Sequence, residues 1–174
     1  MPELLDKNGR TEAEAIAEHK KHNYPKPALT ADCVLLAQQA GAWRLLLIRR
    51  GGHPFLGCWA LPGGFADEGE TIERTAAREL EEETCVTGVP MKLVGVYSAP
   101  GRDPRGWTVS AAYVAVLPDG AVSATAADDA AEVAWVPVSR KPDGGVAVET
   151  PDGARLAFDH AQIISDAVNA AGIL

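Results

Sequence analysis

The strongest constraint on this chain is a block of acidic residues between Gly64 and Val86. Eight carboxylates and two arginines fall in this block, which gives it a local net charge of −6. The whole chain of 174 residues has a formal net charge of −8, so the remainder carries only −2. Charge concentrated in this way needs an explanation other than solubility, because like charges repel each other when the chain folds.

The second half of the block predicts an amphipathic helix over residues 71–84. An apolar stripe at helical spacing can anchor it on a core: Ile72, Ala76 and Leu80. Three carboxylates at positions i, i+3 and i+4 share another face: Glu79, Glu82 and Glu83. Like charges at this spacing destabilise an isolated helix by roughly 0.2–0.5 kcal/mol per pair. The helix therefore needs a compensating positive charge.

A hard divalent cation would supply that charge. Mg²⁺ and Mn²⁺ prefer carboxylate and carbonyl oxygens, and Mg²⁺ commonly leaves positions for water and for substrate phosphates. Gly63-Gly64 precedes the helix and lets the backbone approach a ligand closely, so the Gly64 carbonyl could be a further ligand. The alternative is an acidic helix face in solvent after a glycine turn.

The rest of the chain alternates short apolar runs with turn residues, which favours one α/β domain, or α+β in mixed-sheet terms, with a partly antiparallel sheet. Three helices are predicted, over residues 11–22, 71–84 and 160–171. Strands are predicted over 29–36, 43–50, 59–61, 92–97, 107–117, 132–138 and around 146–148.

The spacing within residues 64–86 resembles the Nudix box. It consists of Gly64, five residues, Glu70, seven residues, Arg78-Glu79-Leu80, one residue and Glu82-Glu83. The resemblance to the Nudix hydrolases covers roughly residues 29–171 and implies a Nudix-type α/β/α sandwich with a central mixed sheet. It makes 29–174 a single domain and 1–28 an N-terminal helix and extension. The family usually has glycine where this chain has Cys85, at the end of the helix.

Carried over by position, the resemblance implies a metal centre on this helix. Glu79, Glu82 and Glu83 are then the carboxylates that bind Mg²⁺ or Mn²⁺, the Gly64 carbonyl is a further ligand, and Arg78 orients one of the carboxylates. Nudix hydrolases cleave a nucleoside diphosphate linked to another moiety. Bound metal ions neutralise the diphosphate and lower the pKa of a bound water.

The group nearest the attacking water is expected to be Glu82 or Glu83, so these two and Arg78 are the candidate catalytic residues. The family does not fix the general base in one place, and the acids in Asp128-Asp129-Ala130-Ala131-Glu132 stay open as alternatives. Glu70 is expected to be a structural member of the box.

A second resemblance, to bacterial ADP-ribose pyrophosphatases, rests on the segment 98–107. That subfamily commonly has an Arg-Asp-Pro-Arg-Gly run before a strand, here residues 102–106, and a proline beyond the box, here Pro100. Arg102 and Arg105 could bind phosphate or ribose oxygens through paired hydrogen bonds, and Asp103 could orient an arginine. The alternative is a turn whose exposed charges form a local Asp–Arg pair.

Several other residues have a structural interpretation beside a functional one. Arg49 and Arg50 end a strand and should point to opposite sides, so one of them, here Arg50, could face phosphate. Trp59 and Phe55 could stack on a base, although core packing is favoured for both. A last group is assigned to structure: Asp159 as a helix cap, His160 as a hydrogen-bonding residue at the helix start, and Trp43 and Trp135 in the core.

The resemblance implies a small-molecule nucleotide substrate, with ADP-ribose cleaved to AMP and ribose 5-phosphate. One alternative is a hydrolase that removes oxidised nucleoside triphosphates. Another is a Nudix domain that senses ADP-ribose without hydrolysis. The intact Glu79, Glu82 and Glu83 argue against a sensor, and about 15 residues after Asp159 leave no room for a winged-helix domain.

Composition limits the partners and the compartment. The negative charge argues against a nucleic-acid partner, and the apolar run Leu45–Ile48 is far shorter than a membrane span. The N-terminus lacks the features of a secretory signal, so a cytoplasmic location is expected, with reduced and mostly buried cysteines at 33, 58 and 85. Related pyrophosphatases often form homodimers, so residues 1–28 could contact a second copy or cover the sheet.

Overall fold

A computed structural model describes residues 4–117 and 130–174 of the chain. Its helices are α1 (Glu12–Lys21), α2 (Ile72–Thr84) and α3 (His160–Ala171). Its strands are β1 (Ala28–Gln39), β2 (Ala42–Arg50), β3 (Trp59–Ala60), β4 (Gly63–Phe65), β5 (Lys92–Tyr97), β6 (Thr108–Leu117), β7 (Ala130–Arg140) and β8 (Val146–Val148). Each predicted helix and strand forms, with ends that differ by a few residues.

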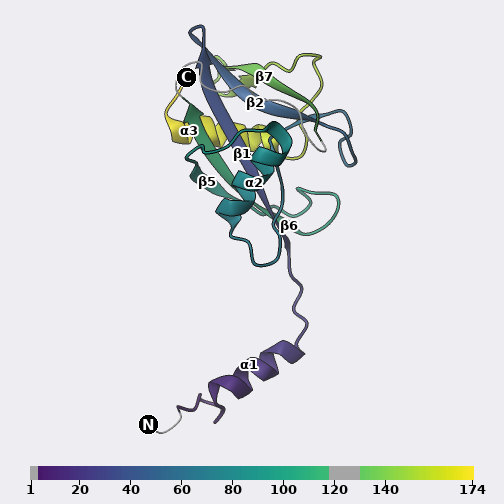
Figure 1. Cartoon of the computed structure of the whole chain (residues 1–174), viewed down its shortest axis with the longest axis vertical. Helices are drawn as coiled ribbons and strands as arrows, with labels where there is room; N and C mark the ends of the chain where they lie inside the picture. Colours follow the sequence, from purple (N-terminus) through teal and green to yellow (C-terminus); the bar gives the residue numbers. More distant parts are fainter. Residues whose placement is uncertain (1–3, 118–129) are drawn as a thin grey trace.

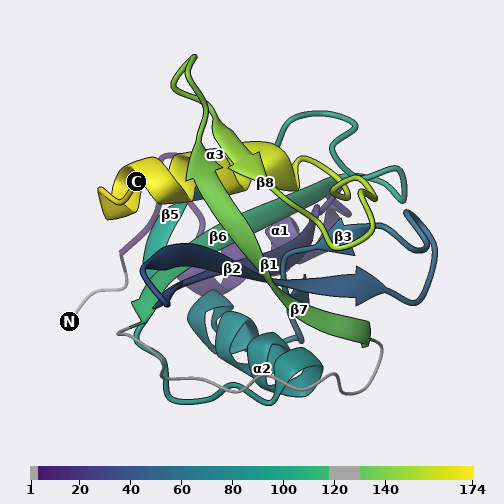
Figure 2. The same ribbon diagram turned by 90° about the horizontal axis from the view of Figure 1, so that it is seen from above.

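The strands make a mixed sheet in the order β5-β6-β1-β2-β7-β8, with β3 paired to β2 and β4 paired to β1. The β1–β6 pair is parallel, and the other pairs are antiparallel. A turn at Ala40 and Gly41, both at positive φ, joins β1 to β2 as a tight hairpin. Figure 2 shows α2 below the sheet and α3 above it, as the α/β/α sandwich requires.

Each helix covers one face of the sheet with its own core. Val34 and Leu36 of β1 belong to the cluster that contains the buried face of α3, whereas Cys33 and Leu35 belong to the cluster under α2. This alternation follows from the two-residue period of a strand. The central strand is apolar on both sides because a helix covers each side.

No strand is predicted at Gly63–Phe65, but in the structure this segment forms β4 and pairs antiparallel with β1. The sequence could not indicate this strand, since two glycines and one phenylalanine have no alternating pattern. The close approach explains the first glycine. A Cβ on Gly63, at φ +156°, would lie 2.9 Å from Cα of Asp32.

Helix α1 lies apart from the sheet at the end of an extended segment (Figure 1). Thr11 and Glu14 form a capping box at its start, and none of its residues is buried. Of the two roles considered for residues 1–28, covering the sheet does not hold for α1. Contact with a second copy stays a prediction.

The cysteines also differ from expectation, because only Cys33 is buried, Cys58 is intermediate and Cys85 is exposed. All three are free thiols. In the part of the chain that the structure describes, no helix combines the length and the apolar character needed to cross a membrane.

Candidate active site

Helix α2 presents its carboxylates from a firmly anchored position. The Thr71 side chain accepts a hydrogen bond from the backbone N–H of Arg74 at its start, and the buried Ala76 and Leu80 hold it on the sheet. The helix ends at Cys85, which adopts the left-handed φ of +57° in the position where the family usually has glycine. The turn is therefore kept without glycine, at a conformational cost.

Arg78 is the centre of an acidic cluster, which we define as Glu70, Arg78, Glu79, Glu82 and Glu83. Its guanidinium donates to Glu70 (3.1 and 3.2 Å), to Glu79 Oε1 (2.8 Å) and to Glu82 Oε2 (2.9 Å). It also donates to the carbonyl of Phe65 at 2.9 Å. The hydrogen bonds from Arg78 lower the pKa of Glu70 to about 2.

Glu79 packs directly against the backbone of Gly64. A Cβ on Gly64 would lie 2.5 Å from Cδ of Glu79, so a larger residue at this position would displace the carboxylate from where it lies. The Glu79 side chain is 14% exposed. Burial raises its pKa above the usual value, although the contact with Arg78 opposes this shift.

Glu83 is partly buried, and its Oε2 accepts a hydrogen bond from the backbone N–H of Gly63 at 2.8 Å. Burial raises its pKa to about 8, and the neighbouring charge of Glu79 adds to the shift while the Gly63 hydrogen bond opposes it. A cation beside Glu79 and Glu83 would stabilise the charged form of both side chains.

The donor set fits a hard divalent cation. Glu79 and Glu83 bring carboxylate oxygens to the backbone at Gly63 and Gly64, and Mg²⁺ commonly binds one or two carboxylates and fills its other positions with water and phosphate. Within residues 4–117 and 130–174, no group of three or more His, Cys, Asp or Glu side chains is already arranged around one metal position. Glu82 instead pairs with Arg78 and is 45% exposed.

Opposite the acidic cluster lies a group of arginines. Arg50, at the end of β2, donates from Nε to the carbonyl of Pro54 at 2.8 Å, and its guanidinium lies 5.1 Å from the centre of the Phe158 ring. No carboxylate in the described ranges lies within 4 Å of it. Burial, and then the charge of Arg105, lowers the pKa of Arg50. Its positive charge is thus available for an anion.

The segment 98–107 places Arg102 and Arg105 in different environments. Arg102 is 5% exposed and forms a two-point ion pair with Asp159 (2.6 and 2.9 Å). Arg105 forms a similar pair with the buried Asp103, at 2.7 to 3.2 Å, and its guanidinium lies over the ring of Phe65 at 4.7 Å. Asp103 therefore orients Arg105, as predicted for an arginine of this segment.

Asp159 does not cap α3 as predicted, because its side chain makes no capping hydrogen bond. Both carboxylate oxygens bind Arg102 instead. A charged two-point pair with a buried guanidinium is stronger than one bond to a backbone N–H, which explains why the carboxylate turns away from the helix.

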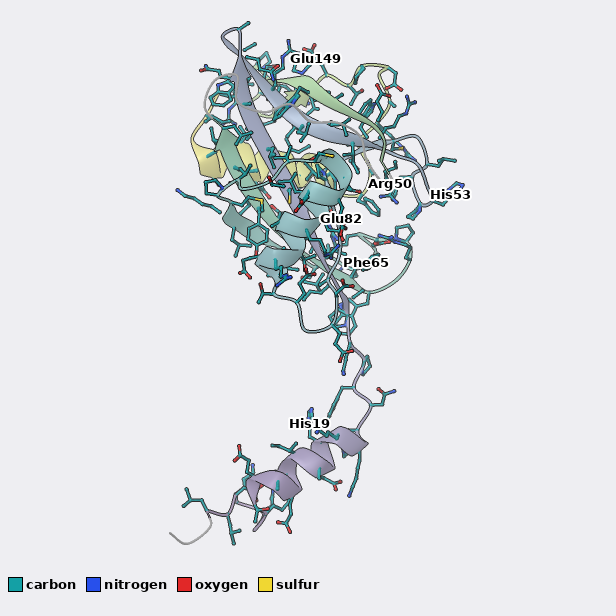
Figure 3. All side chains as sticks on the ribbon, in the orientation of Figure 1. His19, Arg50, His53, Phe65, Glu82 and Glu149 are labelled. Carbon is teal, nitrogen blue, oxygen red and sulfur yellow. The ribbon has the colours of Figure 1, made fainter. Side chains whose placement is uncertain are left out.

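Two adjoining cavities connect the carboxylates with the arginines. The larger, of about 710 Å³, is lined by Gly63, Gly64, Arg78, Glu79 and Glu83 together with Arg50 and Arg105. The smaller, of about 40 Å³, shares Arg50, Gly63, Gly64 and Arg105 with it, and we call it the recess. The other residues that line the recess are Thr30, Asp32, Leu61, Arg102, Asp103, Phe158 and His160. In Figure 3, Arg50, Phe65 and Glu82 lie on the same side of the domain.

Two residues of the recess were not anticipated as functional. Asp32 lies on the buried strand β1, where a charged residue among apolar ones is the signal that could have indicated it. His160 is buried, and its Nδ1 accepts a hydrogen bond from the backbone N–H of Leu61 at 2.9 Å. Its Nε2 therefore carries the proton and lies 3.5 Å from Oδ1 of Asp32. Burial lowers the pKa of His160, so the ring is neutral.

Trp59 and Phe55 pack as their structural interpretation predicts, whereas Trp43 and Trp135, assigned to the core, are only partly buried. Trp59 is fully buried and donates from Nε1 to Asp152 at 2.9 Å, and Phe55 packs on Phe158 with 4.7 Å between ring centres. Arg49 points away from Arg50 and pairs with Asp152 at 2.7 Å. Among the acids considered as general base, Asp128 and Asp129 lie outside the described residues.

Comparisons with known proteins identify the family of this chain. The family model described as "NUDIX domain" matches residues 26–148. An ADP-ribose pyrophosphatase of Methanocaldococcus jannaschii is 38% identical over 143 residues, which are 82% of this chain and 74% of that protein. The chain belongs to the Nudix family.

Two solved structures resemble the chain over nearly its whole length. A MutT/nudix family protein from Enterococcus faecalis has a TM-score of 0.83 and 35% identity, over 94% of this chain and 70% of that one. The NUDIX domain of Shewanella oneidensis NrtR, complexed with ADP ribose, has a TM-score of 0.77 and 33% identity, over 93% of this chain and 99% of that one.

Proposed function

We propose that this Nudix pyrophosphohydrolase cleaves ADP-ribose to AMP and ribose 5-phosphate with Mg²⁺ or Mn²⁺ as its metal ion. The observation that carries the proposal is that carboxylates and arginines line one cavity, with Glu79 and Glu83 from α2 beside Arg50 and Arg105 from other segments. A diphosphate needs both a divalent cation and fixed positive groups around its oxygens.

In this proposal Glu79, Glu82 and Glu83 hold the metal ion, and the Gly64 carbonyl adds a further oxygen. The bound ion supplies neutralisation of the diphosphate and a water of lowered pKa. Arg78 holds Glu79 and Glu82 in place through hydrogen bonds of 2.8 and 2.9 Å. Glu82 or Glu83 is the group nearest the attacking water.

Arg50, Arg102, Asp103 and Arg105 are the proposed substrate-binding residues, with unequal roles. Arg50 and Arg105 border both cavities and can donate to phosphate oxygens directly. Arg102 is paired with Asp159, and Asp103 is paired with Arg105. Arg102 and Asp103 therefore shape the recess and do not line the larger cavity.

Similarity to proteins that act on or bind ADP-ribose supports the choice of substrate. The likeness to a domain complexed with ADP ribose also favours a second candidate, a domain that binds ADP-ribose without cleaving it. A small nucleotide, rather than a nucleic acid, is the proposed partner because of the net charge of −8. A homodimer is a further proposal, which light scattering of the purified chain would test.

The test is product release from a panel of nucleotides with Mg²⁺, with an EDTA control. The panel contains ADP-ribose, NADH, diadenosine polyphosphates, 8-oxo-dGTP and CoA. Metal-dependent AMP release that is fastest from ADP-ribose supports the proposal. Faster cleavage of a nucleoside triphosphate would contradict the proposal and favour a hydrolase of oxidised nucleotides. Binding of ADP-ribose without turnover would contradict it and favour a domain that senses ADP-ribose.

A further inference from the structure

We propose that Asp32 selects the substrate by accepting a hydrogen bond from a sugar hydroxyl of the group linked to the nucleoside diphosphate. The same carboxylate repels a third phosphate placed in that position. This inference rests on the proposed function and adds a specificity-determining residue to it. Asp32 comes from β1, which also contributes Thr30 to the lining of the recess.

Asp32 lies at the junction of the recess and the acidic cluster. Its side chain is 10% exposed, and it pairs with Gly63 of β4 across the sheet. A Cβ on Gly63 would lie 3.0 Å from Oδ1 of Asp32, and the N–H of Gly63 donates to Glu83. A group bound at Asp32 would therefore lie beside Gly63, whose backbone N–H binds the proposed metal ligand Glu83.

The Asp32 carboxylate has unused capacity to accept hydrogen bonds. An ionised carboxylate offers about four acceptor positions. Within residues 4–117 and 130–174 it accepts one side-chain hydrogen bond, from the Ser110 hydroxyl to Oδ2. Arg102 at 3.7 Å and His160 at 3.5 Å are close enough to stabilise its charge but form no hydrogen bond with it. A buried carboxylate with free acceptor positions on a cavity is suited to a ligand that donates.

Size and charge indicate a hydroxyl as that donor. The recess, at about 40 Å³, has room for a few water-sized groups, since one water needs roughly 10–15 Å³ measured in this way. A nucleobase does not fit into it. A phosphate oxygen would meet a carboxylate of the same charge, whereas a hydroxyl can donate to Asp32 and accept from a neighbouring guanidinium.

Arg50 and Arg105 would determine the orientation in which the substrate binds. Arg50 and Arg105 border both cavities, so they would bind the phosphate nearest the recess and leave the sugar hydroxyls to Asp32. A nucleoside triphosphate bound with the same two phosphates at the metal would point its third phosphate at Asp32. Repulsion between these two anions disfavours that substrate.

The first test compares ADP-ribose with ATP as substrates of the wild type and Asp32→Asn. Asparagine has the same shape and can still accept from Ser110, but it has no charge. We expect the ratio of kcat/KM for ADP-ribose over that for ATP to fall by at least about 10-fold, because a charge-assisted hydrogen bond and a repulsion are lost together.

The matched control is Asp166→Asn, which makes the same chemical change on α3, where Asp166 accepts a hydrogen bond from Tyr97. This variant should keep the wild-type ratio. An equal fall in kcat/KM for both substrates in Asp32→Asn would overturn the inference, because a general structural role predicts that result.

The second test measures binding by calorimetry in Mg²⁺ and does not depend on turnover. Ribose 5-phosphate should bind Asp32→Asn about 10-fold more weakly than the wild type, while AMP binding changes by less than about 2-fold. In the wild type itself, ribose 5-phosphate should bind more tightly than inorganic phosphate, which tests the hydroxyl contact without a variant. Equal affinity for these two ligands overturns the inference.

These measurements separate the two proposals. Wild-type cleavage of ADP-ribose with unchanged ribose 5-phosphate binding in Asp32→Asn overturns the role of Asp32 and leaves the proposed function standing. Weaker ribose 5-phosphate binding in Asp32→Asn, without cleavage of ADP-ribose by the wild type, supports the role of Asp32 and overturns the proposed function.

Discussion

The acidic cluster and the recess are built in opposite ways. The acidic cluster has four carboxylates and one guanidinium, which pairs with three of them, and all five residues come from the chain between Glu70 and Glu83. The recess is lined by Arg50, Arg102 and Arg105 and by two carboxylates from separate segments, Asp32 and Asp103, while Asp159 pairs with Arg102. The first region has an excess of negative charge that a cation can neutralise, whereas the second has fixed charges of both signs and can select a ligand by charge and by hydrogen bonds.

The first prediction removes one charge from the acidic cluster. Glu82→Gln should lower turnover by at least about 100-fold in the presence of Mg²⁺, because the proposed metal site loses one of its carboxylates. The helix should keep its stability, since Glu82 is 45% exposed and lies away from the buried Ala76 and Leu80. Steady-state kinetics and a thermal melt would measure both quantities.

Glu81→Gln is the matched control, because it makes the same change at the neighbouring exposed residue of α2. Its turnover should stay close to that of the wild type. If Glu82→Gln also kept wild-type turnover, Glu82 would have to be removed from the proposed metal site.

The second prediction removes a charge from the recess, where the main effect should be on stability. Arg102→Ala leaves Asp159 and the buried Asp32 without their guanidinium and should lower the free energy of unfolding by about 3 kcal/mol. Arg10→Ala breaks an exposed two-point pair with Asp6 and should cost less than about 1 kcal/mol. Urea denaturation would measure the free energy of unfolding of both variants. An equal decrease in the two would contradict the expected difference between the recess and an exposed ion pair.

The third prediction tests whether the wall of the recess distinguishes substrates. Arg105→Ala should raise KM for ADP-ribose more than KM for a nucleoside triphosphate, by a factor of about 5–10, since it removes a charge-assisted hydrogen-bond donor. Arg140→Ala, on an exposed arginine that donates to Gly144, should change neither KM. Equal changes in both KM values for Arg105→Ala would leave the segment 98–107 without a selective role.

The fourth prediction uses the raised pKa of Glu83. The pKa is about 8 in the folded protein and about 4.5 ordinarily, so the folded state holds a proton that the unfolded state has lost. The metal-free protein should therefore lose stability as the pH rises from about 4.5 to 8. Thermal melts in EDTA should show this slope, and Glu83→Gln should flatten it. A slope that is the same in both proteins would show that Glu83 does not titrate in this range.

The smallest expected effect concerns the end of α2. Cys85→Gly should raise the free energy of unfolding by about 0.5–1 kcal/mol, because glycine adopts the left-handed φ of +57° without strain from a side chain. Cys85→Ala keeps a Cβ and should stay close to the wild type. A loss of stability in Cys85→Gly would mean that the entropy of the unfolded chain outweighs the relief of strain.

The elements of the fold could be predicted wherever a local pattern decides them. The stripe of Ile72, Ala76 and Leu80 was sufficient for α2, and the apolar runs were sufficient for β1 and β2. Strand β4 could not be found, because its only signal is its pairing with β1. The position of α1 away from the sheet also has no signal in the sequence of the helix itself.

The same division separates the two halves of the site. Sequence alone determined that Glu79, Glu82 and Glu83 share a face of α2, because residues three and four apart on a helix do so whatever the rest of the chain does. The tertiary structure alone decided the recess. The parallel pairing of β1 with β6 brings Asp32 to Ser110, and the packing of α3 brings Asp159 to Arg102, 57 residues away in the chain. Such contacts depend on sheet register and helix packing, which no local periodicity encodes.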